Sequence, residues 1–151
     1  MGRTYEMKNL ITTVIFICIT YANAGKAKEV AFINHASSAA EWVYFSGPST
    51  AAEWVYFSGA STAAEWIYVT NNCNFADVEV VSGLPTYADW IYFSGASTAA
   101  EWVYLSGAST AAEWIYITNS PTSADYTICF PRNFDYTKKH IAAIYITVLK
   151  K

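Results

Sequence analysis

The sequence has almost no positive charge across its centre. Its nine Lys and Arg residues lie near the two ends, and none occurs between Glu29 and Asp125. A nucleic-acid-binding protein needs a basic stripe that neutralises phosphates. We therefore expect no nucleic-acid partner.

The sequence also lacks the residue groupings that catalysis and metal binding require. It contains no Gly-rich phosphate loop and no serine in a nucleophile-elbow setting. His35 and His140 lie far apart, without Cys or acidic neighbours at metal-ligand spacing. The carboxylates recur with a regular period, which is typical of scaffold residues rather than of one unequal acid–base pair. These absences predict a protein that is not an enzyme and that has no cofactor or metal site.

A long apolar membrane span is missing as well. The apolar run from Leu10 to Tyr21 is shorter than the roughly 20 residues that a spanning helix needs. It follows a short polar stretch and precedes Ala22-Asn23-Ala24, a small-x-small pattern suited to signal peptidase. Residues 1–24 are thus predicted to be a signal peptide that starts at Met1 or Met7. The mature chain, 25–151, is expected to be secreted or periplasmic, with no stable membrane span.

Cysteine is scarce. The chain has three cysteines, and removal of the signal peptide takes Cys18 away. Cys73 and Cys129 remain, and their spacing follows no recognisable disulfide framework. From the residues alone, one disulfide and two separate thiols are equally compatible with an exported protein.

A twelve-residue repeat dominates what is present. Nine units run from residue 27 to residue 134, and the unit 51–62 reads AAEWVYFSGAST. Position three is Glu or Asp, all six tryptophans stand at position four, and position nine is mostly Gly or Asn. Units two to four resemble units six to eight, which indicates a duplicated 48-residue block. After an insert at 135–139, the degenerate copy HIAAIYITVLKK at 140–151 is predicted as a terminal strand.

Each unit favours a β-strand over a helix. A capping box at Thr50–Glu53 favours a helix, but that helix would have only about eight residues, too few to be stable alone in water. Consecutive aromatic and β-branched residues fit a strand better. We predict one all-β domain of about ten short strands, each followed by a turn with positive φ at position nine.

The recurring acids constrain how these strands stack. A parallel in-register solenoid would set the acids about 4.8 Å apart, with no cation of the chain nearby. Either a bound metal such as calcium bridges them, or consecutive repeats are not direct neighbours. We favour the second arrangement, as in a barrel, a sandwich or an entangled sheet, and keep the β-solenoid as the alternative.

Several units begin with a small residue, Ala and Asp, followed by alternating apolar residues. Examples are FADVEVV at 75–81, YADWIYF at 87–93 and SADYTICF at 123–130. In this the chain resembles the septoil-knot family, small β domains of tandem Ala-Asp-led repeats threaded into a deep knot. The resemblance implies a knotted β fold, with no known activity and no catalytic residue.

On a strand, positions five and seven form an aliphatic face that is predicted to be core. Positions four and six form an aromatic face that is either a second core layer or an exposed strip. If exposed, the strip consists of Trp42, Tyr44, Trp54, Tyr56, Trp66, Tyr68, Trp90, Tyr92, Trp102, Tyr104, Trp114 and Tyr116.

The sequence therefore predicts a secreted, non-catalytic β-repeat protein with a structural or interaction role. One alternative is a lectin-like protein that stacks extracellular glycans on the aromatic strip. Another is a self-assembling extracellular fibre, because strand-forming segments such as WVYF carry little charge. The expected partner is accordingly a glycan or a second copy of the chain.

Overall fold

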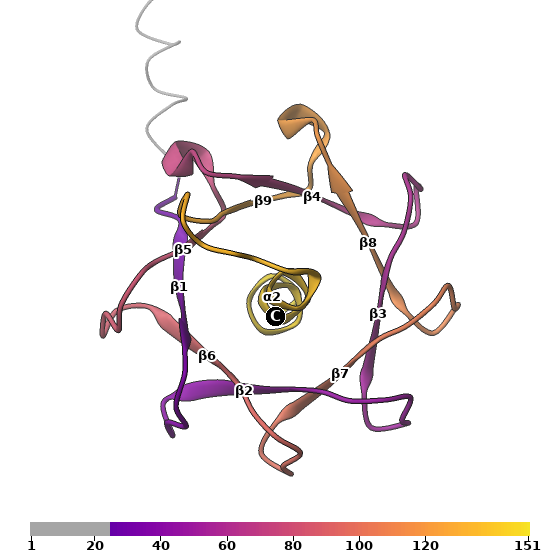
Figure 1. Cartoon of the computed structure of the whole chain (residues 1–151). Coiled ribbons are helices and arrows are strands. Elements are labelled where there is room, and N and C mark those ends of the chain that lie inside the picture. Colours follow the sequence, from indigo (N-terminus) through magenta and orange to yellow (C-terminus); the bar gives the residue numbers. More distant parts are fainter. Residues whose placement is uncertain (1–24) are drawn as a thin grey trace, which may run out of the picture.

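The computed structural model describes residues 25–151, which form a closed barrel of parallel strands around a C-terminal helix (Figure 1). The predicted signal peptide lies outside these residues. The strands are β1 (Lys28–Ile33), β2 (Ala40–Phe45), β3 (Glu53–Phe57), β4 (Glu65–Thr70), β5 (Val78–Val80), β6 (Asp89–Phe93), β7 (Glu101–Leu105), β8 (Glu113–Thr118) and β9 (Tyr126–Cys129). The helical segments are η1 (Cys73–Phe75), η2 (Pro121–Ser123), α2 (Lys138–Ile144) and the π-helical turn η3 (Tyr145–Leu149).

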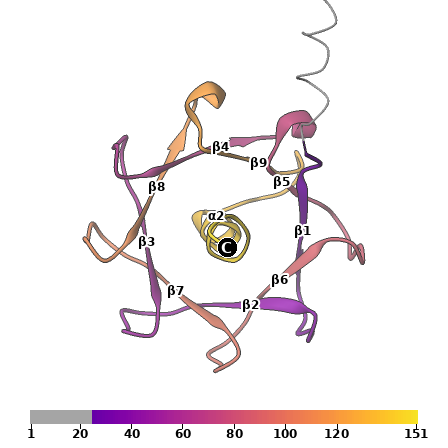
Figure 2. The ribbon, with the colours of Figure 1, turned by 180° about the vertical axis from the view of Figure 1, so that it is seen from behind.

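The chain travels around the barrel twice. The strand order is β1-β5-β9-β4-β8-β3-β7-β2-β6, and β6 closes the ring against β1. Strands β1 to β5 make the first circuit, and β6 to β9 fill the spaces between them, as both views of the ribbon show (Figures 1 and 2). The prediction that consecutive repeats are not direct neighbours is confirmed. The barrel is not the β-solenoid kept as the alternative, and the knotted path implied by the family resemblance stays a prediction.

The strand register explains the twelve-residue period. The last residue of β2, Phe45, and the first residue of β3, Glu53, both lie opposite Val103 of β7. The amide of Ser46, which follows β2, donates to the carbonyl of Val103 at 2.9 Å. Since the helix fills the lumen, the connection must cross β7 on the outside, and Figure 1 shows such connections projecting outward. One repeat is thus one strand plus one crossover over a strand of the other circuit.

This interleaving keeps the acidic residues apart. Glu41 lies opposite Ile91 of β6, and Glu53 lies opposite Val103 of β7. Each neighbouring strand is therefore displaced along its length, so that these two carboxylates face aliphatic residues rather than other carboxylates. Among the regular strands, the like-charge contact that an in-register stack would create does not arise. Between β1 and β5, Glu29 does lie opposite Glu79, and Lys26 forms an ion pair with Glu29.

The inner face of the barrel is aliphatic, as predicted. Position five of the six regular units is fully buried: Val43, Val55, Ile67, Ile91, Val103 and Ile115. The irregular units depart from this pattern. β5 buries positions four and six, Val78 and Val80, whereas β1 buries Val30 and Ala31 and β9 buries Ile128 and Cys129. Their strands β1, β5 and β9 are neighbours in the ring. We call these three strands the irregular sector.

The prediction of a terminal strand at 140–151 is wrong, because this segment forms most of α2 and all of η3 inside the barrel. The barrel accordingly has nine strands rather than about ten. Residues Ile141 to Thr147 are buried on every side of the helix. Inside a closed ring no strand partner is available, whereas a helix satisfies its backbone hydrogen bonds internally. The β-branched residues favour a strand, but the lack of a strand partner inside the barrel makes this segment a helix.

The helix matches the space that the strands enclose. Nine steeply staggered strands form a cylinder with a backbone radius of roughly 11 Å. After inward side chains are allowed for, that leaves room for one α-helix, whose diameter is about 10 Å. The helix therefore supplies the core that the barrel's own side chains are too short to complete.

The predicted positive φ at position nine is confirmed at Gly83 and is wrong for the other position-nine glycines. Gly83 alone among the described glycines has a positive φ, at 85°. At Gly47, Gly59, Gly95 and Gly107 an added Cβ would meet nothing within 4 Å. Nothing in the structure explains why these four positions are glycine.

A substitution in the helix tests how much the barrel depends on its core. We expect Ile144→Ala to lower the free energy of unfolding by about 2–5 kcal/mol, because it leaves a cavity among fully buried side chains. Urea denaturation of the oxidised protein measures the change. Leu84→Ala removes the same number of carbon atoms from a half-exposed side chain and serves as the control. Equal losses in the two variants would contradict a helix-dependent core.

Candidate functional site

The twelve aromatic residues of the predicted strip form a belt around the outside of the barrel. Neighbouring strands place the Trp of one opposite the Tyr of the next, and the rings meet edge to face with centroids 4.9–5.5 Å apart. The pairs are Trp42–Tyr92, Tyr44–Trp102, Trp54–Tyr104, Tyr56–Trp114 and Trp66–Tyr116. This is the geometry in which aromatic pairs attract beyond simple burial.

The aromatic belt ends at the irregular sector. Trp90, at one end, lies opposite Ala31 of β1. Tyr68, at the other end, lies opposite Thr127 of β9. The structure thus brings all twelve predicted residues onto one outer surface, over six of the nine strands.

Each tryptophan is also tied to the crossover that precedes its strand. The indole N–H of Trp54 donates to the carbonyl of Ser49 at 3.1 Å, and the hydroxyl of Ser49 accepts the amide of Ala51 at 3.2 Å. The other five indoles donate in the same way to the carbonyl five residues earlier, at 2.8–3.0 Å. The tryptophan therefore fixes the crossover, which accounts for its place at position four.

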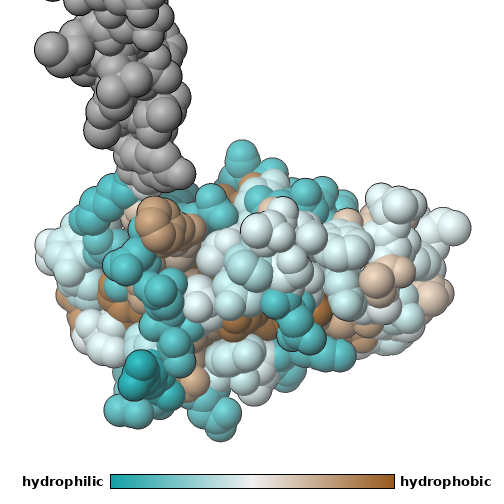
Figure 3. Space-filling model, turned by 90° about the horizontal axis from the view of Figure 1, so that it is seen from above, coloured by the Kyte–Doolittle hydropathy of each residue, from teal (hydrophilic) through white to brown (hydrophobic). Residues whose placement is uncertain are grey.

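All twelve belt residues are partly buried. They belong neither to a closed second core nor to a freely exposed strip, the two alternatives left open by the sequence. On the face shown in Figure 3, hydrophobic residues lie in separate patches among hydrophilic and near-neutral ones. The indole N–H groups already have partners, so they are not free to bind a ligand.

The two ends of the barrel carry opposite charge. Because every strand runs in the same direction, the acids at position three gather at one end, here called the acidic end. These acids are Glu29, Glu41, Glu53, Glu65, Asp77, Asp89, Glu101, Glu113 and Asp125.

The acidic end receives its counter-charges from the chain termini. Lys150, just after the inner helix, contacts Glu53 at 2.9 Å and Glu113 at 3.0 Å. Lys151 contacts Glu41 at 3.1 Å. The expectation that no cation of the chain lies near the acids is therefore wrong. Sequence reasoning missed these lysines because their position depends on the helix passing through the barrel.

The opposite end, here called the basic end, is aromatic and positively charged. Lys138 and Lys139 at the start of α2 lie over the rings of Phe57 and Phe45, each 5.2 Å from the centroid. Arg132 lies in the segment that leads to this helix, and all three cations are exposed. A cation above an aromatic face is attracted by the ring.

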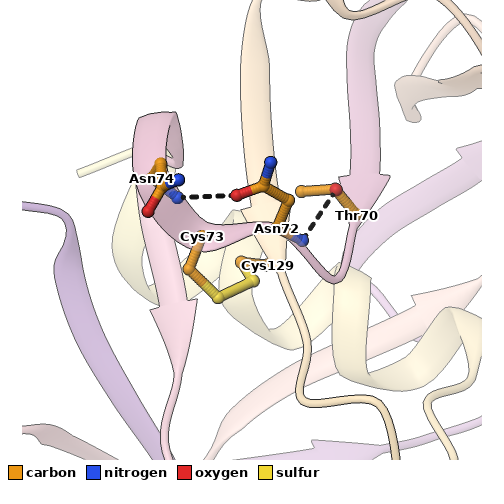
Figure 4. Close-up of a disulfide and its surroundings, with 5 residues drawn as sticks. All are labelled: Thr70, Asn72, Cys73, Asn74 and Cys129. Carbon is orange, nitrogen blue, oxygen red and sulfur yellow. Dashed lines mark hydrogen bonds between the residues drawn. A yellow bond between two sulfur atoms is a disulfide. The ribbon is translucent and has the colours of Figure 1, made fainter.

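A disulfide joins the two circuits beside the irregular sector. Cys73 of η1 and Cys129 of β9 are bonded, with their Cα atoms 5.2 Å apart (Figure 4). The amide of Asn72 donates to the hydroxyl of Thr70 at 3.0 Å, which orders the start of this connection. A bond that closes 56 residues of chain stabilises the fold by about 4 kcal/mol in the chain-entropy model. The sequence left open whether these cysteines pair, and the structure shows that they do.

Within residues 25–151, no group of three or more potential metal ligands comes together. In the same range, no helix has both the length and the apolar character needed to cross a membrane. No protein-family model, curated protein or solved structure matches the chain. Function must therefore be inferred from the geometry itself.

His140, at the start of α2, is an ionisable side chain that the barrel partly buries. Its ring packs edge to face against Phe32 and Phe134, with ring centroids 4.8 Å and 5.2 Å apart, respectively. Its Nδ1 accepts the amide of Thr137 at 3.0 Å, which caps α2. Burial lowers the pKa of the imidazole, and the charge of Asp135 only partly opposes this. The rings packed on it are uncharged, while Lys138 and Lys139 flank it on the helix.

We expect His140 to make stability depend on pH. In the unfolded chain the imidazole titrates near pKa 6.5, and in the folded barrel its pKa is lower. The unfolded state therefore binds the proton first, and the free energy of unfolding falls as pH drops below about 6.5. The fall levels off below the folded pKa. Urea denaturation between about pH 5 and about pH 8 measures this dependence.

His140→Gln should remove this component of the pH dependence, whereas His35→Gln, which changes an exposed histidine, should retain it. An unchanged pH profile in His140→Gln would show that other groups cause the dependence.

Proposed function

We propose that the chain is a secreted, non-catalytic β-barrel module with a structural or interaction role. One observation carries this proposal: the recurring aromatic and serine residues bind the protein's own crossovers. The indole of Trp54, for example, is held by Ser49 and packs against Tyr104. Side chains that bind the crossovers in this way make the barrel rigid, which suits a structural role. The disulfide supports export, because such bonds persist in oxidising compartments.

Glycan binding on the aromatic belt receives less support from the contacts. A sugar ring stacks on a free aromatic face, whereas these rings pack edge to face against neighbours. All twelve rings are also partly buried, which reduces the aromatic area open to a sugar. Hydrogen bonding from the indoles to sugar hydroxyls would also break bonds to the crossovers.

Tryptophan fluorescence tests the two roles directly, since every tryptophan occupies the same repeat position. We expect partial quenching by acrylamide and no change in emission on adding soluble neutral polysaccharides. This follows from partly buried rings whose N–H groups are occupied. Ready quenching of all six residues, together with a polysaccharide-dependent shift in emission, would contradict the structural role and favour the lectin-like one.

A second candidate function is self-assembly, although not by strand pairing. The closed ring leaves no strand edge free among residues 25–151, so the fibre mode suggested by WVYF is unavailable without opening the barrel. The opposite charges of the acidic end and the basic end favour a different contact, in which barrels stack end to end. Such a head-to-tail contact continues into a filament.

Sedimentation velocity at low and high salt tests end-to-end stacking. We expect association at about 0.01 M salt and dissociation at about 0.5 M, because exposed charges are screened. The double variant Lys138→Glu/Lys139→Glu should remain monomeric at both salt concentrations. Thr62→Glu adds a negative charge to an exposed crossover and should leave association unchanged. A wild-type protein that is monomeric at low salt and high concentration would overturn this second function.

A further inference from the structure

A cavity of about 340 Å³ opens where the irregular sector meets the regular strands. It lies between the C-terminal ends of β4 and β9 and the segment that leads into α2. In the ninth unit that segment reads FPRNF at 130–134, where four of the regular units read SGAST or SGPST and the other two read TNNCN and TNSPT. The cavity thus lies at a place where the repeat sequence is broken.

One wall of this cavity is aromatic and firmly packed. Phe130 is 2% exposed and stacks on Tyr136, with centroids 4.6 Å apart and ring planes 14° from parallel. Phe130 also packs against Phe134, with ring centroids 5.4 Å apart. Tyr136 is 43% exposed, so it presents aromatic surface to solvent beside the opening. Such a surface suits a flat ring.

Arg132 gives the cavity a positive charge that no acid within the described residues neutralises through a salt bridge. It lines the cavity, is exposed, and forms no salt bridge with any residue between 25 and 151. The barrel's ring of acids lies at the opposite end. A guanidinium binds a carboxylate through two parallel hydrogen bonds, which makes an unpaired arginine beside an aromatic wall suited to an organic acid.

The cavity is also rigid. The amide of Phe130 donates to the carbonyl of Thr70 at 2.9 Å, which joins its two sides. Thr70 lies opposite Cys129 in the register, and Cys129 is bonded to Cys73 (Figure 4). Asn71 and Thr70 also line the cavity and are neutral residues that can form hydrogen bonds. A site ordered before binding loses little conformational entropy when a ligand enters.

We propose that this cavity binds a small organic anion that carries a carboxylate on a six-membered ring. Arg132 pairs with the carboxylate, the ring rests against Tyr136 and Phe134, and Asn71 and Thr70 bind its polar substituents. A uronic acid and a benzoate share this chemistry. A neutral sugar of the same size lacks the group that Arg132 recognises.

Calorimetry or NMR titration of the oxidised mature chain tests the site, with galacturonate, benzoate and galactose as probes. We expect binding of at least one of the two acids and at least tenfold weaker binding of galactose. Galacturonate binding alone identifies a sugar acid as the ligand class, and benzoate binding alone identifies an aromatic acid. Failure of both acids to bind at millimolar concentration overturns the proposal.

Variants separate the site from general charge effects. Arg132→Gln should weaken acid binding at least tenfold, and Arg132→Lys should weaken it less. Lys138→Gln removes an equal charge from the same end of the barrel but outside the cavity lining, and it should leave the affinity unchanged. An equal loss in Arg132→Gln and Lys138→Gln would show nonspecific attraction and overturn the assignment. Thermal unfolding of each variant verifies that this exposed substitution has not altered the fold.

Discussion

The fold depends on the burial of its own C-terminal helix inside the barrel. Nine steeply tilted strands enclose a space that the inward Val and Ile side chains cannot fill alone. Ile141 and Ile144 complete this core from the axis outward. A packed interior without voids is the ordinary state of a folded protein, and here one segment provides it for every strand at once. The barrel and the helix are thus parts of one cooperative unit.

The helix also places positive charges close to the acids of the barrel. A parallel barrel made from a repeat places every position-three acid at the same end, which would be unfavourable if these charges were left unbalanced. Lys150 and Lys151 reach that end because the chain passes through the lumen. At the other end, Lys138 and Lys139 lie over phenylalanine rings. The polarity of the molecule follows directly from parallel strands and a fixed repeat.

The most regular part of the sequence and the most irregular part differ in what they contribute. In the six regular strands, tryptophan and serine hold the crossovers of one circuit over the strands of the other. This accounts for the near-identity of the repeats without invoking a ligand. The irregular sector instead carries the disulfide and the cavity beside Arg132. Departures from the repeat therefore mark the places where the molecule differs chemically from a uniform scaffold.

The sequence by itself determined the strands, their twelve-residue spacing, the aliphatic core face and the separation of the acids, because these follow from local alternation and like-charge repulsion. It placed the twelve aromatic residues on one face but could not decide their burial, which depends on crossovers that pass above them. It read HIAAIYITVLKK as a strand from its β-branched residues. Only the tertiary structure made that segment a helix, because a closed ring offers no hydrogen-bonding edge to a further strand and leaves a space the width of a helix. The pairing of Cys73 with Cys129, and of the terminal lysines with the acids, was likewise decided by the path of the chain through space.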